Sequence, residues 1–150
     1  MSLLNSLTEE LKAAMRAKDS LKLEALRAIK SAVLLAKTAT AGDNNLTEEE
    51  EIKLLQKLVK QRKDSAVIFK EQNRDDLATP EEAQAEVISQ FLPEQLSQQE
   101  IEQIVDEIVA KTRAQGMKDM GKVMGMASKE MAGKADGKTI STIVKQKLNG

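Results

Sequence analysis

The candidate functional residues of this chain are lysines near its carboxyl end. From residue 113 to residue 150 there are eight Lys and Arg residues against three Asp and Glu residues, a balance of +5, whereas the whole chain balances to −1. Six of these lysines form the candidate binding set: Lys118, Lys122, Lys129, Lys134, Lys138 and Lys145. A basic surface of this kind predicts contacts with the phosphates of a polyanion. A solvated helix face that binds nothing is the alternative.

The residue types that are missing narrow the chemistry further. The chain contains no His and no Cys, which removes the commonest general base, the commonest metal ligands and the thiol nucleophile. We therefore expect no metal site and no cofactor. The lack of Cys fits a reducing compartment. The sequence starts without a signal-peptide pattern, and no apolar run approaches the roughly 18 residues of a membrane span, so we expect a cytoplasmic protein without a membrane partner.

A glycine-rich turn over residues 133–139, Gly-Lys-Ala-Asp-Gly-Lys-Thr, superficially resembles a phosphate-binding loop. A Walker A motif needs four residues between its glycines, whereas Gly133 and Gly137 enclose three. Nucleotide hydrolysis is therefore excluded. Two interpretations remain open: the first amides of the next helix bind a backbone phosphate together with Lys134 and Lys138, or Asp136 caps that helix itself.

Methionines and lysines occupy opposite sides of the helix expected over residues 118–132. Met117, Met120, Met124, Ala127 and Met131 recur at intervals of three and four, and the lysine stripe points about 165° away from them at 100° per residue. This pattern favours methionines in the core. The alternative is an exposed docking patch formed by unpaired methionines among Met117, Met120, Met126 and Met131.

Two glycines of the same helix, Gly121 and Gly125, form a GxxxG pattern. Their charged surroundings exclude the membrane version of this motif. Close approach of another helix or of a ligand backbone remains, and the pattern favours helix packing.

Periodicity and capping signals predict an all-α fold of seven helices. The near absence of aromatic residues, with Phe69 and Phe91 alone, fits helix-on-helix packing. Helices are expected over about 4–18, 20–38, 48–73, 80–92, 98–115, 118–132 and 137–148. Start signals precede four of them: Asp19, Thr47 with Glu50, Thr79 with Pro80 and Glu82, and Ser97 with Glu100. Residues 40–46 are expected to form a loop, and Gly116 to end the fifth helix as a C′ residue.

The best candidate boundary is the segment 93–96, because Pro93 disfavours helix at the residue before it. We expect residues 1–95 to form an N-terminal four-helix bundle and residues 96–150 a small three-helix tail.

At this point several blocks of residues resemble a known family. Taken in order over nearly the full length, they are similar to the GatB/YqeY domain family. The blocks are Leu26–Ala32 (LRAIKSA), Lys60–Ala66 (KQRKDSA), Arg74–Ala78 (RDDLA) with Glu86, Phe91–Ser97 (FLPEQLS), Met120–Met124 (MGKVM) and Gly133–Lys138 (GKADGK). The last two blocks also resemble the C-terminal tail of GatB, one of the subunits of the glutamine-dependent aminoacyl-tRNA amidotransferase.

The resemblance implies an all-helical, two-lobe, bacterial protein, grouped with carbon–nitrogen ligases that use glutamine as amide donor. In the amidotransferase the corresponding tail touches tRNA, so the resemblance implies tRNA as partner, bound through the six lysines. The part of GatB that activates the aminoacyl end is absent, and no amidase signature is visible. We therefore expect a tRNA-binding accessory protein without catalysis of its own. The alternative is a protein-interaction module that docks on amidotransferase subunits or an aminoacyl-tRNA synthetase.

Overall fold

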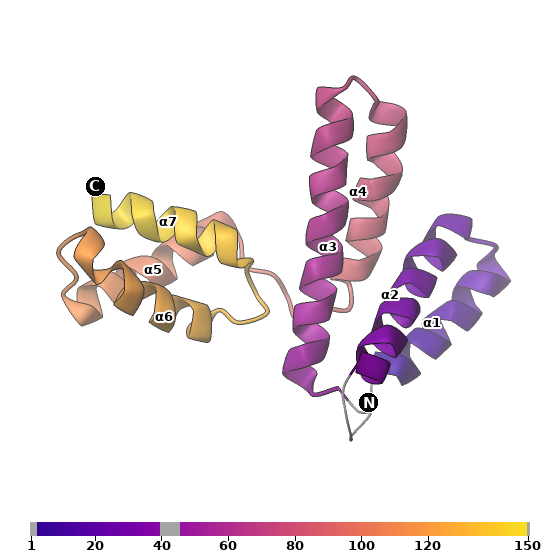
Figure 1. Ribbon diagram of the computed structural model, residues 1–150, viewed down its shortest axis with the longest axis horizontal. Coiled ribbons are helices and arrows are strands. Elements are labelled where there is room, and N and C mark those ends of the chain that lie inside the picture. The colour runs from indigo at the N-terminus through magenta and orange to yellow at the C-terminus, as the bar shows by residue number, and fades with distance from the viewer. Residues whose placement is uncertain (1–2, 40–45, 150) are drawn as a thin grey trace. The chain divides into compact units, whose positions relative to one another are not determined.

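The structure is a computed structural model that describes residues 3–39 and 46–149. Every regular element in these ranges is helical, which confirms the all-α class (Figure 1). The elements are α1 (Leu3–Ala17), α2 (Ser20–Ala39), α3 (Glu48–Glu71), α4 (Asp75–Ser89), α5 (Gln98–Thr112), the short 3₁₀ helix η1 (Met117–Asp119), α6 (Met120–Glu130) and α7 (Gly137–Asn149). Residues 40–45 of the expected loop lie outside the described ranges.

Internal contacts divide the chain into two compact units, Met1–Leu92 and Pro93–Gly150. The first holds α1 to α4 and the second holds α5 to α7 with η1. The more detailed arrangement, a four-helix bundle followed by a three-helix tail with its boundary at residue 95, stays a prediction.

The first unit is built from paired helices. In it α3 runs alongside α4, α1 packs on α2, and α2 also contacts α4 (Figure 1). Leu26 and Ile29 of α2 and Ile88 of α4 are completely buried at the centre of its core. The aliphatic periodicity that predicted helices therefore also identifies the side chains that hold them together.

The second unit surrounds a separate apolar core. Val105 of α5, Val123 of α6 and Val144 of α7 are each fully buried, and each helix contacts the other two. Because each helix turns its apolar face to this shared core, its opposite face is left to solvent. The six candidate lysines come from η1, from α6 and α7, and from the turn between these last two helices.

Two predicted capping boxes are confirmed. The hydroxyl oxygen of Thr47 accepts from the amide of Glu50, whose carboxylate accepts from the amide of Thr47. Ser97 and Glu100 make the same reciprocal pair at the start of α5. The Asp19 cap is also confirmed, since Oδ1 of Asp19 accepts from the amide of Lys22 at 3.1 Å.

The predicted start of the fourth helix was wrong. Helix α4 begins at Asp75, so Pro80 lies inside it rather than at its first position. The amides of Leu77 and Ala78 already bond to the carbonyl of Arg74, and Ala78 is fully buried. Burial of the earlier turn outweighs the one backbone hydrogen bond that Pro80 cannot donate.

The predicted role of Gly116 was also wrong. Helix α5 ends at Thr112, and the C-cap residue Arg113 adopts the left-handed conformation with φ 55° and ψ 39°. Gly116 is extended, with φ 167°, and precedes η1. The amide of Ala114 bonds back to the carbonyl of Val109, which closes the helix before Gly116 is reached.

No helix of the described ranges is both long and apolar enough to cross a membrane.

Candidate nucleic-acid interface

All six candidate lysines have exposed side chains. They lie on η1 (Lys118), on α6 (Lys122 and Lys129), in the turn after it (Lys134) and on α7 (Lys138 and Lys145). Among the residues that the structure describes, none of the six forms an ion pair. Unpaired ammonium groups on one small unit can neutralise phosphates without first giving up an intramolecular partner.

The inward face of α6 explains why its lysines point to solvent. Val123 and Ala127 are fully buried, while Met120, Met124 and Met126 pack against the same core. At 100° per residue, Lys122 and Lys129 lie about 100 to 160° away from this buried pair. Met120 and Met124 therefore pack against the core, as the sequence favoured, whereas Met117 of the same predicted stripe is exposed.

Of the methionines considered for an exposed docking patch, Met131 is completely buried and Met120 and Met126 are only partly accessible. Only Met117, 42% exposed, is open to solvent among those four. The alternative of an exposed patch from methionines among these four is therefore reduced to Met117. One accessible thioether does not make an interaction surface.

The expectation that Gly121 and Gly125 pack against another helix was wrong. Both glycines are exposed, and a Cβ atom built on either would meet no atom within 4 Å. They lie on the same outward side of α6 as Lys122 and Lys129. The helix backbone between the lysines is therefore uncovered by the rest of the described chain.

Helix α7, like α6, has exposed lysines and a buried apolar face. Lys138 and Lys145 are exposed, seven residues apart, whereas Ile140, Ile143 and Val144 are buried. Lys147 lies in the last turn of this helix. Its Nζ atom is 3.2 Å from Oδ1 of Asp106, so it links α7 to α5.

The turn between α6 and α7 settles the role of Asp136. Its Oδ1 atom accepts from the amide of Thr139 at 2.7 Å, and its Oδ2 atom accepts from the hydroxyl of Thr139 at 2.8 Å. Asp136 therefore caps α7 itself, which was one of the two open interpretations. A phosphate at this position would meet a carboxylate already bonded to the helix start.

The segment before α5 holds this turn in place. The side-chain amide of Gln95 donates to the carbonyl of Gly133 at 2.8 Å, and the backbone amide of Leu96 donates to the carbonyl of Lys134 at 2.9 Å. Gly133 has φ 78°, a conformation that strains other residues. Sequence reasoning missed Gln95, because its partner is distant in the chain and no local pattern marks it.

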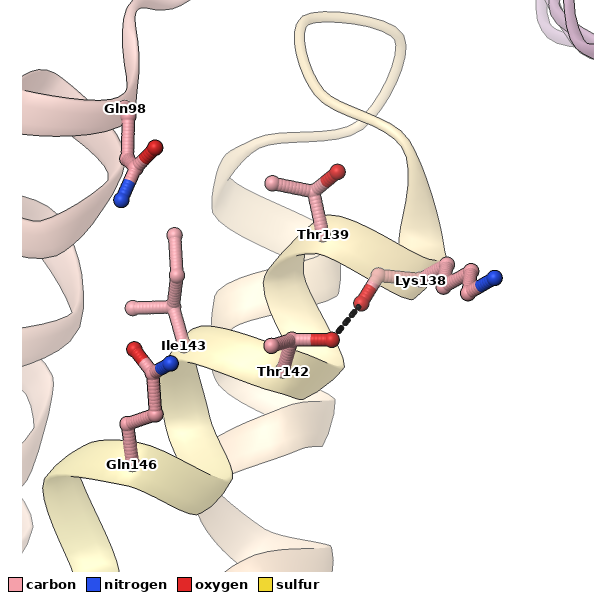
Figure 2. A pocket seen from close by; sticks show the side chains of 6 residues that line it. All are labelled: Gln98, Lys138, Thr139, Thr142, Ile143 and Gln146. Carbon is pink, nitrogen blue, oxygen red and sulfur yellow. Dashed lines mark hydrogen bonds between the residues drawn. The ribbon is translucent and has the colours of Figure 1, made fainter. Parts of the chain in front are cut away.

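The second unit has a groove with Lys138 of α7 among its lining residues (Figure 2). Its volume is about 220 Å³. The lining residues are Gln98 of α5 and Lys138, Thr139, Thr142, Ile143 and Gln146 of α7. Figure 2 shows the amides of Gln98 and Gln146 on either side of Ile143, while the Thr142 hydroxyl donates to the carbonyl of Lys138 at 2.9 Å. Sequence reasoning missed this groove, since it needs two helices brought together.

Within the described ranges, no three His, Cys, Asp or Glu residues are grouped closely enough to hold a metal ion. The acidic start of α3 contains a half-buried carboxyl, Glu51, whose pKa is raised by burial and by the neighbouring charge of Glu48. It lies in the first unit, apart from the candidate lysines in the sequence.

Comparison with known proteins gives local and long matches. The chain is 40% identical over 73 residues to the E subunit of glutamyl-tRNA(Gln) amidotransferase from Thermococcus gammatolerans, covering 46% of this chain and 12% of that protein. It is 41% identical over 91 residues to altered inheritance of mitochondria protein 41 of Clavispora lusitaniae, covering 61% of this chain and 52% of that protein. The chain thus spans about an eighth of the first relative and about half of the second.

A longer match extends over most of both proteins. Altered inheritance of mitochondria protein 41 of Saccharomyces cerevisiae is 33% identical over 138 residues, which cover 89% of this chain and 70% of the yeast protein. The family model described as Yqey-like protein matches residues 4–148. This chain therefore belongs to the family of Yqey-like proteins.

Proposed function

We propose that this chain is a tRNA-binding accessory protein that binds through the lysines of its second unit. The observation that carries the proposal is that all six candidate lysines are exposed and lack ion-pair partners among the described residues. The similarity to an amidotransferase protein whose name contains glutamyl-tRNA(Gln) supports tRNA as the polyanion. Because no aromatic residue lies in residues 93–150, base stacking is not available, and contacts to a folded RNA backbone fit better.

Association with an amidotransferase fits the same similarity and is the second candidate function. It predicts that protein partners remain bound after nuclease treatment of a cell extract. The tRNA proposal predicts instead that purified chain and purified tRNA suffice. A cytoplasmic, bacterial setting is part of the proposal.

The test is a fluorescence titration of labelled tRNA at several salt concentrations. We expect affinity to fall steeply with salt, and the removal of each phosphate contact to flatten the slope of log K against log salt by about 0.7 to 0.9. The triple variant Lys118→Glu, Lys122→Glu and Lys138→Glu should bind far more weakly than the unchanged chain. Its matched control, with the same change in net charge, replaces three exposed lysines of the first unit: Lys30→Glu, Lys57→Glu and Lys63→Glu. Absence of binding at low salt, or equal losses of affinity in both triple variants, would refute the proposal.

A further inference from the structure

We propose that the groove between the start of α5 and α7 binds a ribose of an RNA backbone and selects RNA over DNA through its 2′-hydroxyl. The inference rests on the proposed tRNA binding and names the part of the RNA that this groove recognises. The first supporting observation is that the groove combines uncharged residues with Lys138. Thr139, Thr142 and Gln146 form an uncharged strip along α7, and Lys138 lines the same groove. The exposed Lys145 follows Thr142 by three residues, which places it about 60° around the helix from Thr142. A backbone whose phosphates contact these lysines places its sugars next to that strip.

The lining of the groove does not suit a phosphate. Lys138 is the one charged residue among those that line it, and Ile143 contributes apolar surface. The two threonine hydroxyl protons are already used, one by the Asp136 carboxylate and one by the Lys138 carbonyl. These hydroxyls can still accept hydrogen bonds but donate none. A phosphate only accepts, so it could use Lys138 and the glutamine NH2 groups but would leave the acceptor oxygens of the threonines and glutamines without donors.

The lining does not suit a stacked base either. No aromatic ring lies in residues 93–150, and the cavity, about 220 Å³, is smaller than the roughly 300 to 1,000 Å³ of pockets that take drug-sized ligands. A single sugar edge fits this size and a mixed polar and apolar lining.

The two glutamines supply what a hydroxyl needs. The side chain of Gln146 makes no hydrogen bond with the described residues, so its two N–H donors and its acceptor oxygen are free. Gln98 donates to Glu102 across a long 3.4 Å, which leaves its carbonyl oxygen available. The 2′-hydroxyl both donates and accepts, and it is the group by which a protein tells RNA from DNA. Amides on both sides of Ile143 match that dual character (Figure 2).

The experiment compares one tRNA-derived RNA hairpin in three forms: unmodified, fully 2′-O-methylated, and 2′-deoxy. The methylated form keeps the RNA-like backbone but loses the hydroxyl donor. The unchanged chain should bind the unmodified hairpin tightest. The double variant Gln98→Ala with Gln146→Ala should bind it about five- to tenfold more weakly. It should also lose the preference over the methylated form while keeping the same salt slope.

The matched control is Gln103→Ala, an exposed glutamine of α5 that does not line the groove. It should leave affinity and preference unchanged. If the unchanged chain binds all three hairpins equally, the ribose inference is overturned although RNA binding stands. The ribose inference is also overturned if the double variant keeps the full preference. If the unchanged chain binds no RNA at any salt concentration, the proposed function itself fails, and this inference with it.

Discussion

The carboxylate of Asp136 makes two hydrogen bonds to Thr139, one to its backbone amide at 2.7 Å and one to its hydroxyl at 2.8 Å. The bond to the amide satisfies one of the unpaired donors at the start of α7. The same carboxylate places a negative charge between Lys134 and Lys138 in the chain. The turn therefore combines a group that stabilises the helix with a charge that opposes binding of a polyanion.

Replacing Asp136 should separate these two effects. Asp136→Asn keeps an oxygen that can accept from the Thr139 amide and removes the charge, so tRNA should bind more tightly at low salt with little change in stability. Asp136→Ala removes the cap as well, which should cost about 0.5 to 2 kcal/mol of stability. Hydrogen exchange of the α7 amides measures the cap, and a tRNA titration measures the charge. Weaker binding by the Asn variant would contradict this account.

A pH dependence should follow from Glu100. Its pKa is lowered from the ordinary value of 4.5, first by its hydrogen bond from the backbone amide of Ser97. The ionised carboxylate therefore stabilises the start of α5 at pH values above the unfolded pKa. This stabilisation is lost as pH falls through the lower, folded pKa. Thermal unfolding of the full chain, followed by α5 resonances between pH 6 and pH 3, should show the second unit weakening on acidification.

Glu100→Gln is the control for this effect, because the amide oxygen still accepts from Ser97 but does not titrate. Its unfolding temperature should depend less on pH over the same range. An equal acid response in both proteins would assign the dependence to other carboxylates.

Features that depend on residues close together in the chain were predictable from the sequence. The boxes at Thr47 and Ser97 each need only residues three apart, and the burial of the α6 methionines and the exposure of its lysines followed from helical periodicity. Three features were not predictable from local patterns. They are the groove lined by Gln98 and Gln146, the hydrogen bond from Gln95 to Gly133, and the ion pair of Lys147 with Asp106. Each of these joins segments far apart in the chain, which local patterns do not register.

The start of α4 shows how a strong local signal fails. Thr79, Pro80 and Glu82 carry the residue types of a helix start, yet the helix begins at Asp75. The side chains of Arg74 and Asp76 form a two-bond ion pair at 3.0 Å, which lowers the pKa of Asp76. Acidic residues in the first turn also favour the positive end of the helix. Because of these effects, the helix begins at Asp75, before Pro80 in the chain.

Substitutions at Thr79 and Pro80 should therefore behave as helix-interior changes. Thr79→Ala should alter stability by less than about 0.5 kcal/mol, since Thr79 is exposed and caps nothing. Pro80→Ala should stabilise the first unit, because it restores an amide that can donate to the Asp76 carbonyl; the gain should stay below the ~3 kcal/mol of a mid-helix proline. Chemical denaturation of the full chain measures both. A loss near 1 kcal/mol in Thr79→Ala would indicate that the helix starts there after all.

Gln84 is the buried polar residue of the described core, with 8% of its surface exposed. Its Oε1 atom accepts from Nε of Arg62 at 3.2 Å, which joins α4 to α3, and Nη1 of Arg62 reaches the Leu58 carbonyl at 3.4 Å. Gln84→Leu fills similar space but leaves the half-buried guanidinium without its main acceptor, so it should destabilise the first unit by about 1 to 3 kcal/mol. Arg62→Leu removes the donor.

A double-mutant cycle decides whether the bond itself matters. If it does, Gln84→Leu should cost less in the Arg62→Leu background than in the unchanged chain, because no charged donor is then left unpaired. Denaturant unfolding of the four proteins gives the coupling free energy. Glu86→Leu, an exposed position on the same helix, serves as control. Additive costs would mean that Gln84 and Arg62 contribute to packing separately, and that the contact between α3 and α4 depends on their apolar residues alone.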